Sequence, residues 1–424
     1  MRGVGFFSLA RSKEGQGNSR KLYRKQDWMT NPMQTVAKIN RGSRDYTRAN
    51  LALFFAGFVT FSTLYDFQPL FPNLVREFGV TPTIASLSLS FGTFALAWTL
   101  PVSGVISDTL GRRSLMGAAV ILTSLLTFVV VGFETLPGML AVRLLQGIVL
   151  AGVPAVAMAY LGEEFEAKAV GHAMGLYIAG NAFGGMTGRI LTAWLSDHMP
   201  WRSAVATIGG ISLVLAVLFL LLLPPSRHFH RQKFHFKGLT GSLLQHLRNP
   251  GLRYLYLIAF FSMGGFVTLY NYVTFRLLGP QFNLSQTEVA LIFLAYAFGA
   301  FGSSFMGGLV NRFGRSPLLF ASLAIMTLGL VMTSLPNLIV TIAGIVVFTI
   351  GFFGAHSIAS AWVGFLVTHS RAQASSLYLF SYYLGSSISG TGGGFFYGTW
   401  GWSGVILLIL LLICGAGLAG VRLA

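Results

Sequence analysis

The stretch "GVISDTLGRRS", residues 104–114, recurs 203 positions later as "GLVNRFGRSP", residues 308–317. In this alignment Gly104 falls on Gly307, Asp108 on Asn311, Gly111 on Gly314 and Arg112 on Arg315. A second pair, "LYIAGNAFG" (176–184) and "LYLFSYYLG" (377–385), repeats at an offset of 201. Two copies of one unit, joined by the basic connection 224–251, account for both offsets. The sequence therefore predicts two structurally related halves.

Each half consists of long apolar segments. Hydrophobic residues make up 54% of the 424 residues and charged residues 10%, whereas soluble proteins carry about 25% charged residues. Twelve runs are long enough to cross ~30 Å of hydrocarbon as helices: 50–72, 82–107, 114–133, 138–161, 170–195, 202–223, 252–278, 286–310, 317–335, 338–363, 372–398 and 401–420. We therefore predict an all-α polytopic membrane protein of twelve transmembrane helices, with six-helix bundles over 50–223 and 252–424.

The net charge of +17 follows the order of these segments. If the N-terminus is cytoplasmic, 24 of the 29 Lys and Arg residues fall on cytoplasmic segments, which is the positive-inside pattern. Both termini and the connection 224–251 are therefore expected in the cytoplasm. Residues 1–49 are polar and basic, and we expect a disordered tail there that sets the topology or faces lipid, rather than one that binds nucleic acid. An organelle transit peptide is the alternative interpretation of this tail.

The sequence gives little support for metal binding or catalysis. The only cysteine is Cys414, so neither a disulfide nor a cysteine metal site is expected. Four histidines in the central connection are interpreted as part of a solvated basic loop rather than as metal ligands: His228, His230, His235 and His246. The chain has no phosphate-binding glycine loop followed by lysine, no nucleophile elbow and no H-E-x-x-H. We expect no enzyme activity and no cofactor.

Three motifs carry a resemblance to a known family. "GVISDTLGRR" resembles the signature G-x-L-a-D-r-x-G-R-R of the major facilitator superfamily, and "RLLQG" (143–147) resembles the R-x-x-Q-G of its proton-linked members. The glycines of 170–195 fit the antiporter signature G-x8-G-x3-G-P-x2-G-G. Gly185 replaces its proline, Arg189 replaces its last glycine, and Thr109 stands at a usual arginine of the first signature. The chain looks most like the drug:proton antiporter group of bacterial inner-membrane exporters.

The resemblance implies several functional properties. The coupling ion would be a proton, the partners a small-molecule substrate and the lipid bilayer, and the active form a monomer. It also implies that Asp108 latches the cytoplasmic gate by pairing with arginine and a helix end. The expected gating residues are Gly104, Asp108, Gly111, Arg112, Arg113, Asn311, Gly314 and Arg315. The alternative is that these arginines only set the topology.

The segment "GLYIAGNAFGGMTGRILTAW" (175–194) combines small residues with one arginine. Glycines one helical turn apart let two helix backbones touch. We expect Gly171, Gly180, Gly184 and Gly188 to pack at the interface between the halves, where close contact would limit leak. Packing alone is the other interpretation.

Charge is scarce within the expected helices. Asp66 in "LYDFQPLFP" is the only carboxylate well inside a predicted helix, and Arg143 and Arg189 are the basic residues at a similar depth. Because buried charges are costly unless paired, we predict that Asp66 pairs with Arg143 or Arg189 and carries the coupling proton. Snorkelling of all three side chains to the membrane surface is the alternative. His356 is a second candidate for protonation.

Aromatic and polar residues on the predicted cavity helices are candidates for substrate contact. They are Tyr270, Asn271, Tyr272, Tyr382 and Tyr383. Aromatic walls with a few hydrogen-bonding groups suit amphipathic or aromatic solutes, although each of these residues could instead serve packing. We expect a proton-coupled exporter of small organic solutes that works by alternating access. The alternatives are a symporter or facilitator for uptake of a sugar or metabolite, and a non-transporting sensor or lipid-handling protein.

Overall fold

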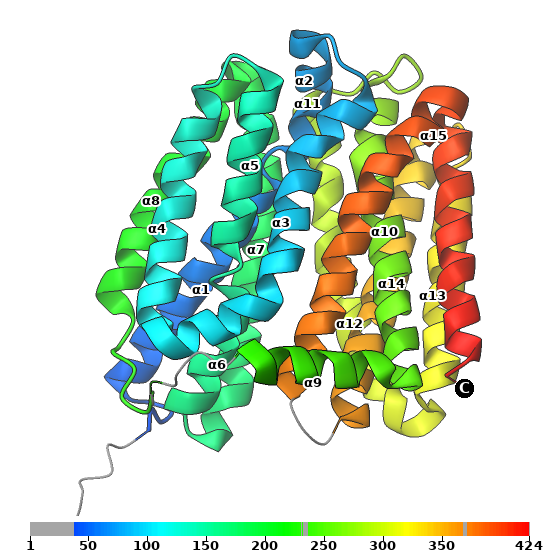
Figure 1. Cartoon of the computed structure of the whole chain (residues 1–424). Coiled ribbons are helices and arrows are strands. Elements are labelled where there is room, and N and C mark those ends of the chain that lie inside the picture. The colour runs from blue at the N-terminus through cyan, green and yellow to red at the C-terminus, as the bar shows by residue number, and fades with distance from the viewer. Residues whose placement is uncertain (1–37, 230, 232–235, 368–370, 424) are drawn as a thin grey trace, which may run out of the picture. The chain divides into compact units, whose positions relative to one another are not determined.

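The computed structural model describes residues 38–229, 231, 236–367 and 371–423, and these residues are almost entirely helical (Figure 1). In the first half the helices are α1 (Arg44–Tyr65), η1 (Gln68–Leu70), α2 (Phe71–Phe78), α3 (Pro82–Leu110), α4 (Arg112–Val131), α5 (Leu136–Leu150), α6 (Pro154–Glu164), α7 (Ala167–His198) and α8 (Trp201–Leu222). Then follow α9 (Phe236–Arg248), α10 (Pro250–Leu278), α11 (Gln286–Ala290), η2 (Leu291–Leu294), α12 (Ala295–Phe313), α13 (Arg315–Met332), α14 (Leu338–Leu366) and α15 (Arg371–Val421).

All twelve predicted segments fall on helices. By length and composition, ten helical stretches of the described residues qualify as membrane spans. One of them is Gln373–Val421, which holds two predicted segments because Gly401 has φ 59° and ψ −144° and reverses the chain. Figure 1 shows α15 as two legs, orange and red. The segment missing from the ten is α7, whose glycines and Arg189 lower its hydropathy.

Capping residues explain where the long helices begin. Ser43 caps α1 by accepting a hydrogen bond from the amide of Tyr46 at 3.1 Å. Thr81, Asn249 and Asn337 cap α3, α10 and α14 in the same way, as side-chain oxygens do at helix N-termini. The bundles expose many large apolar side chains, among them Leu221, Phe301 and Leu418, as expected for surfaces that face lipid.

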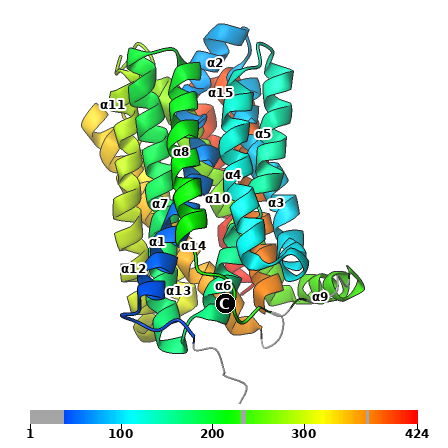
Figure 2. The same cartoon turned by 90° about the vertical axis from the view of Figure 1, so that its left-hand side faces the viewer.

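The predictions for two segments without regular structure, the tail 1–49 and the connection 224–251, are wrong in part. Residues 1–37 of the predicted disordered tail lie outside the described residues, but Ile39 pairs with Phe165 and α1 already begins at Arg44. The connection 224–251 contains α9, which lies transverse to the long helices near one end of the bundle (Figures 1 and 2). Both segments are polar, and for that reason the sequence predicted loops. Backbone pairing at Ile39 and formation of helix α9 give them regular structure instead.

Of the four histidines in the connection, the two that the structure describes, His228 and His246, are not part of the solvated loop that the sequence suggested. His228 donates its backbone N–H to Oε1 of Glu164 at 2.9 Å, and its Nδ1 lies 3.0 Å from Oε2. His246 is buried on α9. His230 and His235 lie outside the described residues.

The repeated turn has the same backbone conformation in both halves. Gly111 joins α3 to α4 with φ 94°, and Gly314 joins α12 to α13 with φ 82°. Only glycine adopts such angles without strain. Both copies of the repeat therefore have glycine at this position of the turn. We call the end of the bundle with these two turns the Asp108 end, and the end with the turns at 79–81, 199–200 and 279–285 the Trp201 end.

The halves meet mainly along α3 and α15, which lie side by side (Figure 1). Thr93 and Ser387 share a hydrogen bond of 2.7 Å, and Thr391 donates to Ser90 at 2.8 Å. At the Trp201 end, Thr287 donates its N–H to Asp197 at 2.8 Å, and Gln286 bonds Asn73. At the Asp108 end a cavity of about 380 Å³ lies between the halves, lined by residues such as Gly104, Asp108, Met158, Gln373 and Leu379.

The glycines of α7 pack inside the first half and not between the halves. A Cβ atom at Gly180, Gly184 or Gly188 would lie closer than 3.0 Å to the backbone of α1. Gly171 has open space around its missing Cβ, so it is not a packing residue in this conformation. The predicted interface is therefore wrong, because helical periodicity shows which residues share a face but not which neighbour that face contacts.

We expect Gly184→Ala to lower the stability of the protein, because a methyl group would push α7 away from the Phe58 backbone of α1. Overpacking of this kind costs ~1–3 kcal/mol. The matched control is Gly175→Ala on the same helix, where a Cβ atom meets open space. Thermal unfolding in detergent compares the two variants, and equal midpoints would contradict the close contact.

Candidate functional site

A buried ion pair joins Asp66 to Arg143. Nη1 of Arg143 lies 3.4 Å from Oδ1 of Asp66, and both side chains are essentially inaccessible to solvent. Oδ2 of Asp66 has no hydrogen-bond partner among the described residues. A carboxylate that is buried and only half-satisfied is costly in a low-dielectric interior. This is one of the two pairings that the sequence predicted.

Arg143 also ties three helices together. Its guanidinium donates to the carbonyls of Thr63 at 2.9 Å and Leu64 at 2.6 Å, at the end of α1. It donates to the carbonyl of Ser88 on α3 at 2.7 Å and to Oε1 of Gln146 on its own helix at 2.9 Å. Helix C-termini present unpaired carbonyls and partial negative charge. Asp66 therefore lies where a cation is already favoured.

Arg189 does not pair with Asp66, so the other predicted pairing is wrong. Its Nε donates to Oε1 of Gln68 at 2.6 Å, and its Nη1 donates to the Gly185 carbonyl at 2.7 Å. Its guanidinium carbon lies 3.8 Å from the ring centroid of Tyr65. The chain bends after α1 into the short helix η1, which contains Pro69. That bend brings Gln68, and not Asp66, to α7.

Gln68 continues the contact into the second half. Its Nε2 donates to Oδ1 of Asn271 on α10 at 2.7 Å. Nδ2 of Asn271 reaches the Gly390 carbonyl on α15 at 3.5 Å. Arg189, Gln68 and Asn271 therefore form a chain of hydrogen bonds from α7 across the contact between the halves. Sequence analysis missed Gln68, although it stands two residues after Asp66.

A central cavity of about 210 Å³ lies between the halves. Its walls come from α1, α7, α10, α12, α14 and α15 and include Tyr65, Arg189, Phe266, Tyr296, His356 and Tyr382. Of these, the sequence predicted Arg189, His356 and Tyr382. Phe266 and Tyr296 were missed because the chain has 37 phenylalanines and 14 tyrosines, and nothing in the sequence marks these two.

The other substrate candidates serve packing in this conformation. Tyr270 shares a hydrogen bond of 2.7 Å with Thr349, and Tyr272 donates to the Gly390 carbonyl at 2.6 Å. Asn271 bonds Gln68, as described above. All three are fully buried, as is nearly all of Tyr383. None of these four side chains lines the central cavity.

His356 lies at the edge of the central cavity. Its Nδ1 lies 3.0 Å from the hydroxyl of Tyr378. Its ring stacks on Phe352, with centroids 5.9 Å apart, and approaches Tyr382 to 4.8 Å. The structure places it within the same cavity as Arg189. Its role in protonation stays a prediction.

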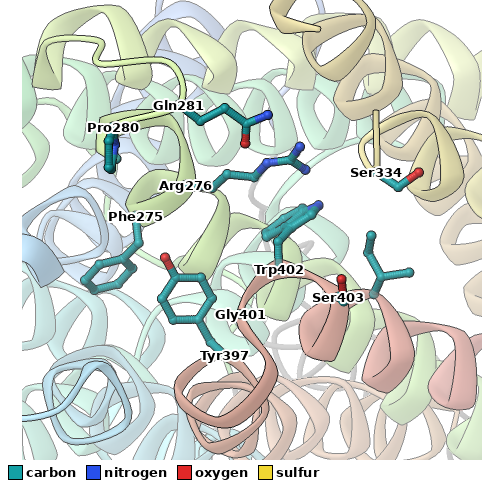
Figure 3. Close-up of a pocket in the computed structure, with 11 residues that line it drawn as sticks. Phe275, Arg276, Pro280, Gln281, Ser334, Tyr397, Gly401, Trp402 and Ser403 are labelled. Carbon is teal, nitrogen blue, oxygen red and sulfur yellow. The ribbon is translucent and has the colours of Figure 1, made fainter. Parts of the chain in front are cut away.

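A larger cavity of about 420 Å³ opens at the Trp201 end (Figure 3). Figure 3 shows Arg276 beside Trp402, and the guanidinium carbon lies 5.2 Å from the indole centroid. This arginine donates to the carbonyls of Thr333 and Leu335 after α13. The N–H groups of the Arg276 guanidinium therefore bond to carbonyls at the end of α13. The central cavity, which both halves line, is the better candidate for a ligand site.

At the Asp108 end, Arg112 bridges two carboxylates. Nη2 of Arg112 lies 2.6 Å from Oδ1 of Asp108 and 2.7 Å from Oε1 of Glu163 on α6. Arg112 also contacts the Ser107 hydroxyl and the Gly104 carbonyl. A Cβ atom at Gly104 would meet open space. Arg113 donates to the Leu220 carbonyl at 2.7 Å and holds α4 to α8.

The second copy of this turn lacks the acidic partners. Arg315 lies over the ring of Phe365, with its guanidinium carbon 3.7 Å from the centroid. Asn311 replaces the aspartate, and both residues line a cavity of about 340 Å³ on their own half. The two turns share a backbone shape, but only the first carries an ion-paired network among the described residues.

Comparisons with known proteins agree with this architecture. The family model of the Major Facilitator Superfamily matches residues 53–279 and 270–423. The chain is 45% identical to the uncharacterized MFS-type transporter YybF of Bacillus subtilis (strain 168), over 88% of this chain and 93% of that protein. It is 44% identical to the inner membrane transport protein YnfM of Escherichia coli (strain K12), over 91% of this chain and 92% of that protein.

Solved structures show the same fold at low sequence identity. A mutant of the nucleoside transporter NupG superposes with a TM-score of 0.72 at 13% identity, covering 88% of this chain and 98% of that chain. A bacterial homologue of the human lysosomal transporter Spinster gives 0.69 at 15% identity, covering 89% and 98%. These relatives and neighbours are transporters and not enzymes.

Proposed function

The chain belongs to the major facilitator superfamily of membrane transporters, and we propose that it is a proton-coupled exporter of small organic solutes across the bacterial cytoplasmic membrane. The observation that carries this proposal is the ion pair between Asp66 and Arg143. It is fully buried, it leaves Oδ2 of Asp66 unsatisfied, and it adjoins Tyr65 in the wall of the central cavity. Buried ionisable groups in membrane spans mark proton or ion pathways.

The proposed mechanism follows from the contacts by which Arg143 holds the end of α1 to α3. A proton on Asp66 removes the charge that pairs with Arg143, and so weakens the clamp between the end of α1 and α3. Tyr65, next to Asp66, lines the cavity, so a shift at the end of α1 alters the substrate site. A ligand moves a conformational equilibrium only through different affinities for its states. Proton and substrate would compete by favouring different states.

The contacts between the halves support alternating access. They join the halves at the Trp201 end through Gln286 and Thr287, whereas the Asp108 end carries a cavity between the halves. The excess of Lys and Arg at the Asp108 end supports a cytoplasmic position for that end and for both termini. In this orientation the structure is closed toward the outside.

Transport by inside-out membrane vesicles tests the coupling and its direction. The vesicles have an acidic interior, and a cell extract of metabolites is added to the external medium. They should accumulate some solutes that control vesicles do not. Mass spectrometry identifies them, and an ionophore that dissipates the pH gradient should abolish accumulation. Accumulation only with the opposite gradient would indicate a symporter for uptake. Equilibration of solutes at the same rate with and without a pH gradient would indicate a facilitator. Absence of any solute movement would indicate a sensor or lipid-handling protein.

We expect Asp108→Asn to slow transport about tenfold, or ~1.4 kcal/mol, without loss of folded protein. The reason is that Asp108 orients Arg112 at 2.6 Å beside the cavity between the halves. Arg112 would keep Glu163 at 2.7 Å, so folding should persist while the gate closes less well. The measurement is the initial transport rate in vesicles at matched protein content.

Glu166→Gln is the matched control, because Glu166 is an exposed carboxylate near the same end. It should transport at the wild-type rate. A wild-type rate in Asp108→Asn as well would remove Asp108 from the gate.

A further inference from the structure

The central cavity contains a guanidinium that no carboxylate neutralises. The side chain of Arg189 lies in the cavity wall and is 2% exposed. Arg189 donates hydrogen bonds to neutral acceptors, the side-chain oxygen of Gln68 and the carbonyl of Gly185. Among the described residues no ion pair includes Arg189, because Asp66 is paired with Arg143. A buried cation without a counter-ion is costly, so the cavity favours an anionic ligand.

The walls around this charge are aromatic. The guanidinium carbon of Arg189 lies 3.8 Å from the centroid of Tyr65 and 5.1 Å from that of Tyr296. In the same lining the rings of Phe266 and Phe352 stack with centroids 3.9 Å apart. Aromatic faces and edges pack best against another flat ring. The cavity therefore favours a planar ligand over a branched aliphatic one.

The volume limits the ligand to a small molecule. Pockets for drug-sized ligands measure ~300–1,000 Å³, and this cavity holds about 210 Å³. One aromatic ring with a carboxylate fits such a space better than a sugar dimer or a polycyclic dye. Most of the lining is apolar, with residues such as Phe266, Val267 and Phe352, so an organic anion with an apolar ring fits better than phosphate.

We infer that the substrate class of this transporter is a small planar organic anion, such as a one-ring aromatic carboxylate. Its carboxylate would bind Arg189, and its ring would lie among Tyr65, Tyr296 and Phe352. This inference rests on the proposed function in taking the central cavity as the transport site. It goes further by assigning the ligand's charge and shape.

Binding of three isosteric probes tests the inference without any gradient. Benzoate, benzamide and benzamidine have the same ring with an anionic, a neutral and a cationic head group. With the purified full chain in lipid nanodiscs, we expect benzoate to raise the thermal unfolding midpoint in a concentration-dependent way. The apparent affinity for benzamide and benzamidine should be at least tenfold lower. Equal effects of all three probes, or no effect of benzoate, would overturn the inference.

Variants locate the binding site. Arg189→Gln keeps a donor for Gln68 but removes the charge, and should weaken benzoate binding at least tenfold. Arg76→Gln removes an exposed cation near the Trp201 end and should bind benzoate like wild type. If Arg189→Gln does not fold, Tyr296→Leu takes its place and should reduce the preference for benzoate over cyclohexanecarboxylate. Unchanged benzoate binding in Arg189→Gln, or an unchanged preference in Tyr296→Leu, would overturn the assignment.

The two proposals fail in different ways. If a pH gradient drives export of neutral or cationic solutes while benzoate does not bind, the anion site is wrong and the coupled exporter stands. If benzoate binds through Arg189 but no gradient drives any solute, the coupling is wrong and the anion site stands.

Discussion

Replacing Arg143 with alanine should destabilise the folded protein more than any other single change considered above. The variant loses donors to the carbonyls of Thr63, Leu64 and Ser88 and leaves Asp66 as a buried, unpaired carboxylate. Breaking a buried pair by removing one partner costs ~3–5 kcal/mol. Loss of the ties between α1, α3 and α5 adds to this cost.

The measurement is the unfolding midpoint of detergent-solubilised protein, together with the fraction that elutes as a single species. Arg202→Ala is the matched control, because Arg202 pairs with Glu77 at a partly exposed site, where such pairs contribute ~0–1 kcal/mol. The double variant Arg143→Ala/Asp66→Asn should recover part of the loss, since asparagine leaves no buried charge. An Arg143→Ala protein as stable as Arg202→Ala would contradict this role.

Replacing Arg189 with lysine should abolish most transport although the charge is kept. The Arg189 guanidinium lies over the Tyr65 ring, 3.8 Å from its centroid, while it donates to Gln68 and to Gly185. An ammonium is a compact point charge on a flexible chain and cannot reproduce that planar arrangement. The chain of hydrogen bonds to Asn271 would lose its first donor. A snorkelling arginine, in contrast, would tolerate lysine.

Initial transport rates at equal surface expression measure this effect. We expect Arg189→Lys to lose at least tenfold in rate, or ~1.4 kcal/mol, and Arg189→Ala to lose more. Arg276→Lys is the control, because Arg276 bonds carbonyls at a helix end outside the central cavity. A wild-type rate in Arg189→Lys would show that only the charge matters.

The fold was largely predictable because its signals are periodic. Segment length and hydropathy located twelve segments that all fall on helices, and the spacing of glycine and arginine in the two turns revealed the repeat. Gly111 and Gly314 confirm it through their positive φ angles. The ordered residues from Ile39 onward and helix α9 were missed, because Ile39 pairs with the distant Phe165 and α9 packs against α10 and α15.

The site was predictable in its charges but not in all its partners. Depth along the helices correctly brought Arg143 to Asp66. The same argument failed for Arg189, because depth leaves the direction around the helix open, and the bend at Pro69 moves Gln68 into its reach. Consecutive residues on a helix point about 100° apart, so Tyr270, Asn271 and Tyr272 could not all face one cavity.

The central claim is that Asp66 carries the coupling proton. It is tested by measuring solute exchange and gradient-driven solute accumulation by the Asp66→Asn variant. Asparagine keeps an oxygen for Arg143 but cannot bind and release a proton. In proteoliposomes the variant should exchange labelled for unlabelled solute near the wild-type rate, yet fail to accumulate solute when a pH gradient is imposed. Accumulation by Asp66→Asn to the wild-type level under the same gradient would contradict the account.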